Sequence, residues 1–322
     1  MLGLMPGVIN DPRNLSLRRS LFAEGGGNIC EEVKTRSTPF RFHDQDPIVG
    51  RFFPVGCSSR RLPTGELYLE LSGYGYVWTD LSGKLGFEAQ AAVSYDTDFQ
   101  VDGSTVYAYF RTRGASPPFF YSRFMEQGQG GLVGLLTMGA PGKSMPDRYG
   151  SQMMGVQLQR GFTVIRDANG GVATAPGVVP PGGKLTTGAY TQLDPDKATL
   201  ANERVELRAN ARDFAGPFKV PAGKRLAVTV SVDGAASIDA LIVPRQVGDA
   251  WLATYTHSLA TTPPPGPVFV DDVIAAGSVY RRSFPVPEGW YFLVFDNTPT
   301  AGRSANPPGN PRVIVSYAVQ LE

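Results

Sequence analysis

The sequence predicts a mainly β protein, and three observations lead to this fold class. Glycine and proline supply 38 and 27 of the 322 residues while charged residues reach only 18%, a balance typical of many short strands joined by turns. Residues 289–297 form an unbroken aromatic and β-branched run that ends in Asp-Asn, which indicates a strand buried on both faces. Residues 312–321 alternate apolar and polar side chains, which is the pattern of a strand with one solvent-exposed face.

Composition divides the chain into two domains and two accessory segments. Residues 1–27 are expected to be a loosely ordered N-terminal arm. Residues 28–171 are predicted to form an antiparallel β-sheet domain that carries one or two apolar helices. Residues 172–202 are rich in Gly and Pro and are interpreted as the connection between domains, and residues 203–322 are predicted to form a jelly-roll-like β-sandwich.

Period-two patterns predict the strands of the first domain. In residues 67–71 three leucines share one face, and the same alternation recurs in residues 87–95 and 106–110. Because turn sequences containing Gly separate these segments, we expect an antiparallel meander. Residues 162–166 add a later strand of the same domain.

Helical spacing follows the meander in two places. Phe120, Phe124 and the leucines of residues 132–136 suit one apolar face of a helix, although the glycines among them weaken it. Residues 147–160 predict a second helix, with Gly161 placed as the residue that ends it.

The second domain contains short apolar segments separated by turn residues. About eight strands in such a length are typical of a sandwich or a jelly roll. The predicted strands before the pair at 289–297 and 312–321 are residues 205–207, 217–223, 226–232, 238–243, 251–255, 268–274 and 279–284.

Two of these segments resemble a known family. Residues 218–224 (FKVPAGK) followed by an alternating strand, and then residues 284–297 (FPVPEGWYFLVFDN), are similar to the GOLD and pre-peptidase C-terminal class of small jelly-roll domains. The resemblance covers about residues 203–322, and residues 298–311 form a longer insertion than such a hairpin usually has. It implies a non-catalytic binding or accessory module.

Charge and motif content argue against several function classes. Thirty basic and 29 acidic residues leave a net charge of +1, so nucleic acid is not expected as a partner. No apolar run is long enough to predict a transmembrane helix. Residues 1–9 are not expected to act as an intact signal peptide, although we expect an extracellular, periplasmic or cell-envelope location. With His43 and His257 as the only histidines, a hydrolase triad would need them to meet across the domains.

Cys30 and Cys57 are the only cysteines, and two interpretations remain open. They either form a disulfide that closes a loop between them or are two unrelated buried thiols.

Aromatic residues are the main candidate for a ligand site. The first sheet carries tyrosines and a tryptophan that could stack on sugar rings or cover part of a lipid if they are exposed together, and methionines of the second helix could line the same site. The alternative is that all of them are ordinary core residues. The candidate residues are Tyr68, Tyr74, Tyr76, Trp78, Tyr107, Tyr109, Met153 and Met154.

Three carboxylates mark a candidate metal site. Asp96, Asp98 and Asp102 crowd the end of a strand and the following turn, where oxygen ligands could hold a structural Ca²⁺. Asp is also a common turn residue, so simple turn chemistry is the alternative. No other cofactor is expected.

These features favour a non-enzymatic binding protein of the cell envelope or the extracellular space, with an apolar or amphipathic ligand. A first alternative is a structural or adhesive component whose sandwich packs on a partner protein. A second alternative is a carboxylate-based hydrolase, which sequence alone does not exclude.

Overall fold

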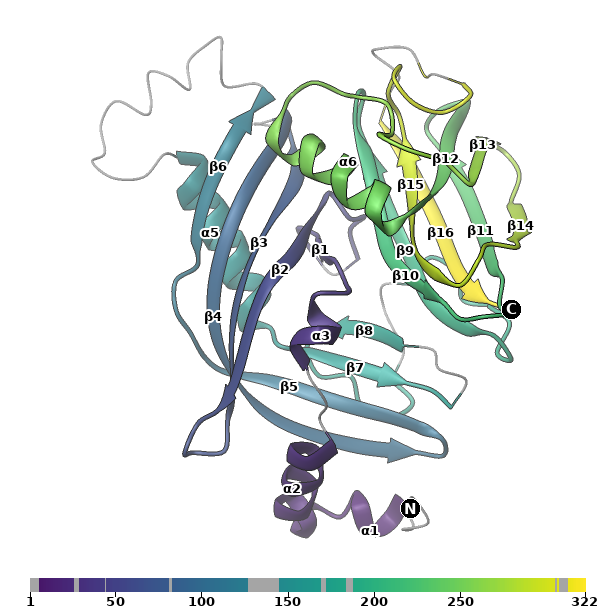
Figure 1. Ribbon diagram of the computed structural model, residues 1–322. Coiled ribbons are helices and arrows are strands. Elements are labelled where there is room, and N and C mark those ends of the chain that lie inside the picture. The colour runs from purple at the N-terminus through teal and green to yellow at the C-terminus, as the bar shows by residue number, and fades with distance from the viewer. Residues whose placement is uncertain are drawn as a thin grey trace.

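A computed structural model describes residues 6–25, 29–43, 45–80, 83–126, 145–168, 172–183, 188–304, 306 and 312–322. The protein is mainly β, with antiparallel sheets and few short helices, which confirms the predicted fold class. One large sheet lies beside a two-sheet sandwich, and helix α6 lies between them (Figure 1).

The N-terminal half forms one antiparallel sheet. Its order is β1-β2-β3-β4-β5-β7-β8, with β6 paired to β4, so the expected meander is present. The strands are β1 (Thr38–Phe40), β2 (Gly50–Arg61), β3 (Leu67–Thr79), β4 (Gly83–Asp102), β5 (Thr105–Ala115), β6 (Phe119–Met125), β7 (Phe162–Arg166) and β8 (Val172–Pro176).

Strand β4 is 20 residues long and divides the sheet into two parts. Its first half pairs with β6 up to Gln90, and its second half pairs with β5 from Val93 onward. The register shifts between Ser94 and Tyr95, and such a bulge bends the strand and increases its twist. As a result β5, β7 and β8 cross the lower part of Figure 1 at a large angle to β2 and β3.

The N-terminal segment is helical, so the expectation of a loosely ordered arm over residues 1–27 is wrong where the structure describes it. It contains α1 (Pro6–Ile9), a 3₁₀ turn (Pro12–Asn14) and α2 (Leu15–Gly25), followed by α3 (Ile29–Val33). Arg18 of α2 is buried and donates to Asp98 of β4 over 2.7 Å. Local composition could not reveal this partner because it lies 80 residues away.

Helix α5 (Met145–Gln159) confirms the second predicted helix. Gly161 follows it with φ +65°, the left-handed conformation that favours glycine after a helix end. The first predicted helix is wrong at its start, because residues 119–125 form strand β6 on the free edge of β4. The rest of that prediction, residues 132–136, lies outside the described residues.

The predicted connection between the domains is shorter than expected. Of residues 172–202, the first five form strand β8 and those from Ala198 onward begin β9 (Ala198–Leu207). The small side chains of this segment made it resemble a linker. Its two ends are nevertheless strands, because the backbone of β8 pairs with β7 and that of β9 pairs with β16.

The C-terminal half is a jelly roll. Its remaining strands are β10 (Arg212–Val220), β11 (Leu226–Asp233), β12 (Ser237–Pro244), β13 (Val270–Ala275), β14 (Tyr280–Phe284), β15 (Gly289–Asp296) and β16 (Val313–Leu321). The first strand pairs with the last, the second with the second last, and so on inward to β12 and β13. Rolling up such a long hairpin produces two four-stranded sheets, β10-β15-β12-β13 and β14-β11-β16-β9.

Helix α6 (Arg245–His257) replaces the strand predicted at residues 251–255. Trp251, Leu252 and Tyr255 are buried and lie at helical spacing on one face. Periodicity cannot distinguish a strand from a helix in so short an apolar run, which explains the error.

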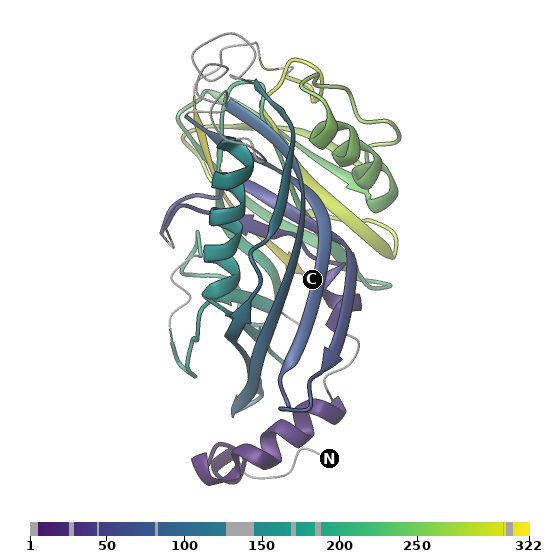
Figure 2. The ribbon, with the colours of Figure 1, turned by 90° about the vertical axis from the view of Figure 1, so that its left-hand side faces the viewer.

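The N-terminal sheet is covered on both faces. On one face Phe87 and Phe120 of the sheet pack together with Met154 of α5, and this helix runs along the sheet in Figure 2. On the other face Tyr76 and Trp78 belong to the same buried cluster as the core of the sandwich. The two halves of the chain therefore share one continuous core.

Candidate ligand cleft at the open edge of the sandwich

The jelly roll has two edges at which the space between its sheets could be reached. One edge is formed by β9 and β10, and the other by β13 and β14. The N-terminal sheet covers the first, which we call the closed edge. The second lies on the far side of the sandwich from that sheet, and we call it the open edge (Figure 1).

At the closed edge Arg51 of β2 reaches between the two sheets. Its Nε and one terminal nitrogen donate to both oxygens of Asp213 over 2.8 and 2.9 Å. The same nitrogen donates to Glu203 and to the hydroxyl of Tyr317, each over 2.8 Å. The Arg51 side chain is 2% exposed, and Tyr76 also donates to Asp213. This edge is filled by an ionic network in which Arg51 and Asp213 are buried.

Burial and charge act in opposite directions on this network. Burial raises the pKa of Tyr317 well above its ordinary value, so the phenol stays protonated. Burial also opposes ionisation of Glu203, but the nearby Arg51 and Arg41 outweigh that cost and hold its pKa below the ordinary value. Glu203 is therefore held in its ionised form by the guanidinium groups beside it.

The open edge contains a cleft of about 300 Å³. Val228, Ala240 and Leu293 line a narrow extension between the two sheets, where there is space of about 10 Å³. The cleft itself is lined by Phe269, Val270, Asp271, Asp272, Arg282, Phe284, Pro285 and Val286.

A polar cluster spans the cleft from one sheet to the other. Asp272 on β13 accepts hydrogen bonds at Oδ2 from the Tyr280 hydroxyl over 2.6 Å and from Arg282 over 2.7 Å, both on β14. Asp272 lies opposite Ala240 and Arg282 opposite Val228, so both occupy inward-facing positions. The Arg282 side chain is nevertheless 58% exposed because β14 is an edge strand.

Electrostatics in the cleft favour hydrogen bonding over proton transfer. Burial, followed by the hydrogen bond to Asp272, raises the pKa of Tyr280 to about 12, so its hydroxyl remains a donor at neutral pH. Burial and the neighbouring Asp239 raise the pKa of Asp271. Within the described part of the chain, Oδ1 of Asp271 is buried without a hydrogen-bond partner.

Aromatic rings form the apolar walls of the cleft. Phe269 is 48% exposed and meets Tyr291 edge to face, with ring centroids 5.6 Å apart. Phe284 is buried, and the guanidinium of Arg282 lies 5.5 Å from its ring centroid. Apolar walls with a few convergent polar groups are typical of ligand sites. The described lining residues include neither histidine, serine nor cysteine.

The structure separates the aromatic residues that the sequence suggested as one ligand site. Tyr76, Trp78 and Tyr109 are buried, so for these three the ligand-site prediction is wrong and the core alternative holds. Tyr76 and Trp78 pack on the sandwich because their inward-facing strand positions meet α6 and β10. Met154 is buried under the opposite face of the sheet, and the side chain of Met153 lies outside the described residues.

The other three aromatic candidates are partly exposed but do not gather. Tyr68 donates to Glu70 near the start of β3. Tyr74 contacts the ring of His257, and Tyr107 lies on β5. No shared site of these residues is present among those that the structure describes.

The carboxylates suggested as calcium ligands have arginine partners instead. Asp96 pairs with Arg19 and Arg113, and Asp98 pairs with Arg18, while Asp102 is exposed. In the described ranges no group of three or more His, Cys, Asp or Glu could hold a metal ion. Helix α2 was not expected, so its residues Arg18 and Arg19 could not be foreseen as partners.

The two cysteines and the two histidines lie away from the cleft. Cys30 of α3 and Cys57 of β2 form a disulfide, with Cα atoms 5.3 Å apart. His43 contacts Asp46, and its neighbour Asp44 lies outside the described residues. His257 lies at the end of α6 beside Glu88, so the two histidines do not meet.

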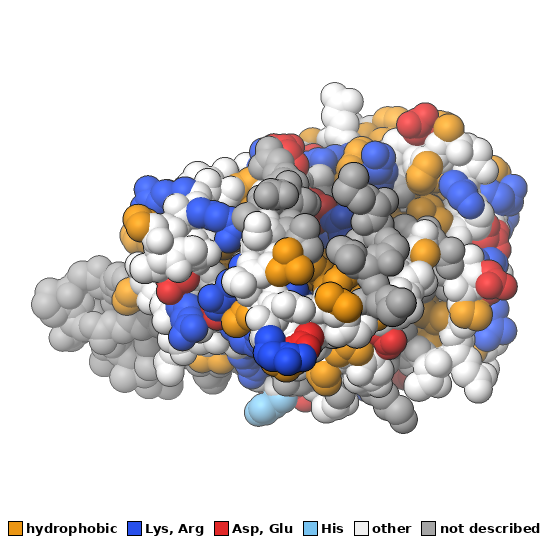
Figure 3. All heavy atoms as spheres, turned by 90° about the horizontal axis from the view of Figure 1, so that it is seen from below, with side chains coloured by type: hydrophobic (Ala, Val, Ile, Leu, Met, Phe, Trp, Pro, Cys, Tyr) orange, Lys and Arg blue, Asp and Glu red, His pale blue; other side chains and the backbone are white. Residues whose placement is uncertain are grey.

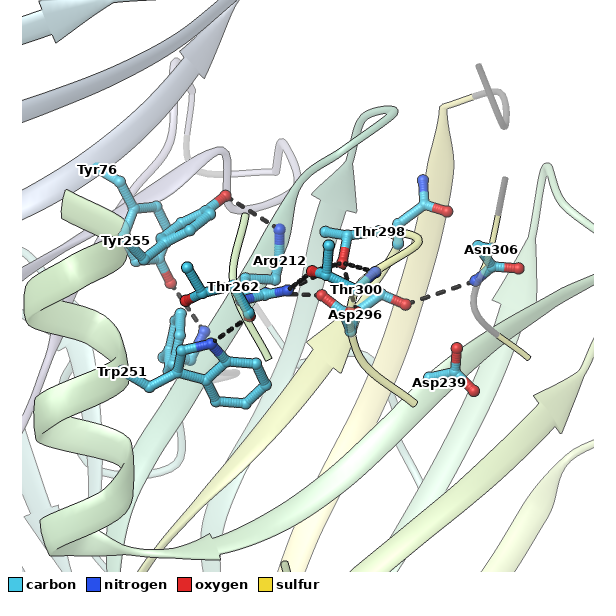
Figure 4. A network of polar contacts seen from close by, with 12 residues as sticks. Tyr76, Arg212, Asp239, Trp251, Tyr255, Thr262, Asp296, Thr298, Thr300 and Asn306 are labelled. Atoms are coloured by element: carbon cyan, nitrogen blue, oxygen red, sulfur yellow. Dashed lines mark hydrogen bonds and ion pairs between the residues drawn. The ribbon is translucent and has the colours of Figure 1, made fainter. Parts of the chain in front are cut away.

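A second buried network holds α6 on the outer face of the sandwich (Figure 4). Arg212 donates to Asp296 over 2.7 Å and to Thr298 over 2.9 Å, and its guanidinium lies 4.3 Å from the ring of Trp251. The Trp251 indole and Arg212 both donate to the carbonyl of Thr262. All these donors have acceptors within the fold, so we assign this network a structural role.

The distribution of charged side chains over the surface does not point to another ligand site. Seen from below, basic, acidic and apolar side chains are interspersed over the molecule (Figure 3). Over the described part of the chain, we find no helix with the length and apolar character needed to cross a bilayer.

Sequence reasoning missed the cleft, although one signal was present. Tyr280, Arg282 and Phe284 alternate on β14, which places a charged residue at an inward-facing position, and Asp272 does the same on β13. A charge at a core position of a predicted strand indicates an edge strand or a site. No protein-family model matches the chain, and no curated protein is significantly similar to it, so the resemblance of residues 203–322 to GOLD-type domains stays a prediction.

Proposed function

We propose that this protein is a non-enzymatic binding protein that holds an amphipathic ligand in the cleft of the open edge. One observation carries the proposal: apolar walls and a charged cluster that bridges the two sheets meet in a single opening of about 300 Å³. The apolar part of the ligand lies against Phe269, Phe284 and Val286, and its polar head reaches Asp272 and Arg282.

The disulfide supports a location outside the reducing cytosol. Disulfides persist mainly in secreted, periplasmic and cell-surface proteins. The bond between Cys30 and Cys57 therefore supports a proposed location in the cell envelope or the extracellular space.

Two probes with the same tail and opposite heads test the binding site. We expect hexylguanidinium, hexanoate or both to shift the amide NMR signals of residues 269–286, because these residues line the cleft. Removing the ring in Phe269→Ala should weaken binding, since the exposed ring is part of the apolar wall.

Phe119→Ala is the matched control, because Phe119 is 52% exposed on β6, far from the cleft. It should bind both probes as the wild type does. If neither probe affects residues 269–286, or if the two variants lose affinity equally, the cleft is not the ligand site.

A further inference from the structure

The closed edge shows which kind of chain segment can cover an edge of this sandwich. There the fold inserts Arg51 from a separate strand between the two sheets, where its guanidinium binds an inward-facing carboxylate, Asp213. Phe53, two positions further on the same face of β2, packs against Phe292 with ring centroids 6.2 Å apart. An extended segment that carries an arginine and, two residues later, an apolar side chain thus covers the closed edge.

The open edge offers a similar set of groups. Asp272 is its inward-facing carboxylate, and it accepts a hydrogen bond from Tyr280 of the facing sheet. At the closed edge a tyrosine also donates to an acid, but there Tyr317 and Glu203 are neighbours in one sheet. The exposed ring of Phe269 and the buried side chains of Phe284 and Val286 line the same cleft as the carboxylate.

The guanidinium that now faces Asp272 is held weakly. Arg282 contacts only Oδ2 of Asp272, whereas Arg51 binds both oxygens of Asp213. No hydrogen bond to Oδ1 of Asp272 is present among the described residues. Surface ion pairs of this kind contribute little stability, so a competing cation could displace Arg282.

Asp272 and Arg282 are the charged residues at the inward-facing positions of the cleft, and their charges cancel. Asp271 is adjacent to Asp272 on β13, so its carboxylate lies on the other face of the strand, near Asp239. A cationic group that replaces Arg282 therefore keeps the charge of Asp272 balanced.

The surroundings suit a peptide. Strands β13 and β14 are the outermost strands of their sheets, so each leaves one side of its backbone unpaired by any described strand. An extended segment can pair with such an edge while its alternate side chains enter pockets.

We propose that the open edge binds an extended segment of a partner protein that inserts an arginine between the two sheets, as β2 does at the closed edge. This inference rests on the proposed function and names its ligand. The arginine binds Asp272 through both carboxylate oxygens, Arg282 turns outward, and an apolar side chain two residues later lies on Phe269 or Val286.

The chain itself supplies the probe. A capped peptide with the sequence of residues 49–55, VGRFFPV, carries the segment that covers the closed edge. We expect it to shift the NMR signals of residues 269–286. The same peptide with citrulline in place of arginine should bind about tenfold more weakly, because it keeps the shape and loses the charge-assisted hydrogen bonds.

Two protein variants complete the test. Asp272→Asn should also weaken binding of the arginine peptide about tenfold, while Asp102→Asn, which removes an equal charge from an exposed turn of the first sheet, should not. Should Asp272→Asn misfold, Phe269→Ala provides the second readout, since its exposed ring can be removed without opening the core.

Four results would overturn the inference: no binding of the peptide, equal binding of the citrulline peptide, equal effects of the two Asp variants, or shifts confined to residues around Arg51 and Asp213 at the closed edge. If the peptide fails but the hexyl probes bind, only the identity of the ligand is wrong. If peptide and hexyl probes all fail to affect residues 269–286, the proposed function falls as well.

Discussion

Arg51 and Arg282 each pair with an inward-facing aspartate of the sandwich, but they differ in burial. Arg51→Ala leaves Asp213 buried without its cation, and losses of about 3–5 kcal/mol follow when one partner of a buried ion pair is removed. We expect this loss in the free energy of unfolding measured with urea. Arg282→Ala removes an exposed partner, so we expect little change. Equal effects of the two substitutions would show that burial does not separate these pairs.

Lys84 provides a second test at the scale of one residue. It is buried, with its amine 3.4 Å from the ring centroid of Tyr255 and 3.0 Å from the carbonyl oxygen of Ser258. Burial, followed by the charge of Arg212, lowers the pKa of Lys84 to about 7, although Glu126 acts in the opposite direction.

The sign of the resulting pH dependence follows from proton binding. Between the folded pKa near 7 and the ordinary value of 10.5, the unfolded chain binds more protons than the folded one at Lys84. Stability should therefore rise with pH through this range, by about 1.4 kcal/mol per pH unit at most. Urea unfolding from pH 6 to pH 9.5 should show this rise in the wild type relative to Lys84→Met. A constant difference between the two proteins across that range would contradict the assignment.

At the scale of one element, α5 contains two glycines with opposite expectations. A Cβ on Gly150 would lie 2.3 Å from the ring of Phe120, which is itself buried under the helix. We expect Gly150→Ala to lower the free energy of unfolding by about 1–3 kcal/mol through overpacking. Among the described residues, a Cβ on Gly155 would meet only Pro118, at 3.7 Å, so Gly155→Ala should stabilise the protein by up to about 1 kcal/mol.

Thermal and urea unfolding of the two variants check this pair of predictions. Both substitutions raise helix propensity equally, so any difference between them reports packing against β6. Destabilisation of both, or of Gly155→Ala alone, would mean that α5 does not lie on the sheet as described.

At the scale of the whole molecule, the two halves of the chain should unfold as one unit. Tyr76 and Trp78 from the first sheet share a buried cluster with the sandwich, and Arg51 joins β2 to strands of both sandwich sheets. Separating the halves would expose this cluster and leave Asp213 without its cation. We therefore expect one calorimetric transition, with equal calorimetric and van't Hoff enthalpies.

Spectroscopy gives a second measurement of the same prediction. Trp78 lies in the first sheet, whereas Trp251 and Trp290 lie in the sandwich half. The variants Trp78→Phe and Trp251→Phe should report coincident fluorescence transitions in urea. Two separated midpoints would show that the halves are independent domains.

The amino-acid sequence by itself determined the mainly β class, most of the strands, helix α5 and the jelly roll, because period-two patterns, turn residues and a helix-ending glycine act locally. It left the edge strand β6, helix α6 and the N-terminal helices undetermined, since each depends on a surface supplied by distant residues. Only the tertiary structure decided that Tyr76 and Trp78 are core and that Asp272 meets Arg282 across a cleft. The physical reason is that burial and ion pairing depend on which faces meet, and period-two alternation shows only that a strand has two faces.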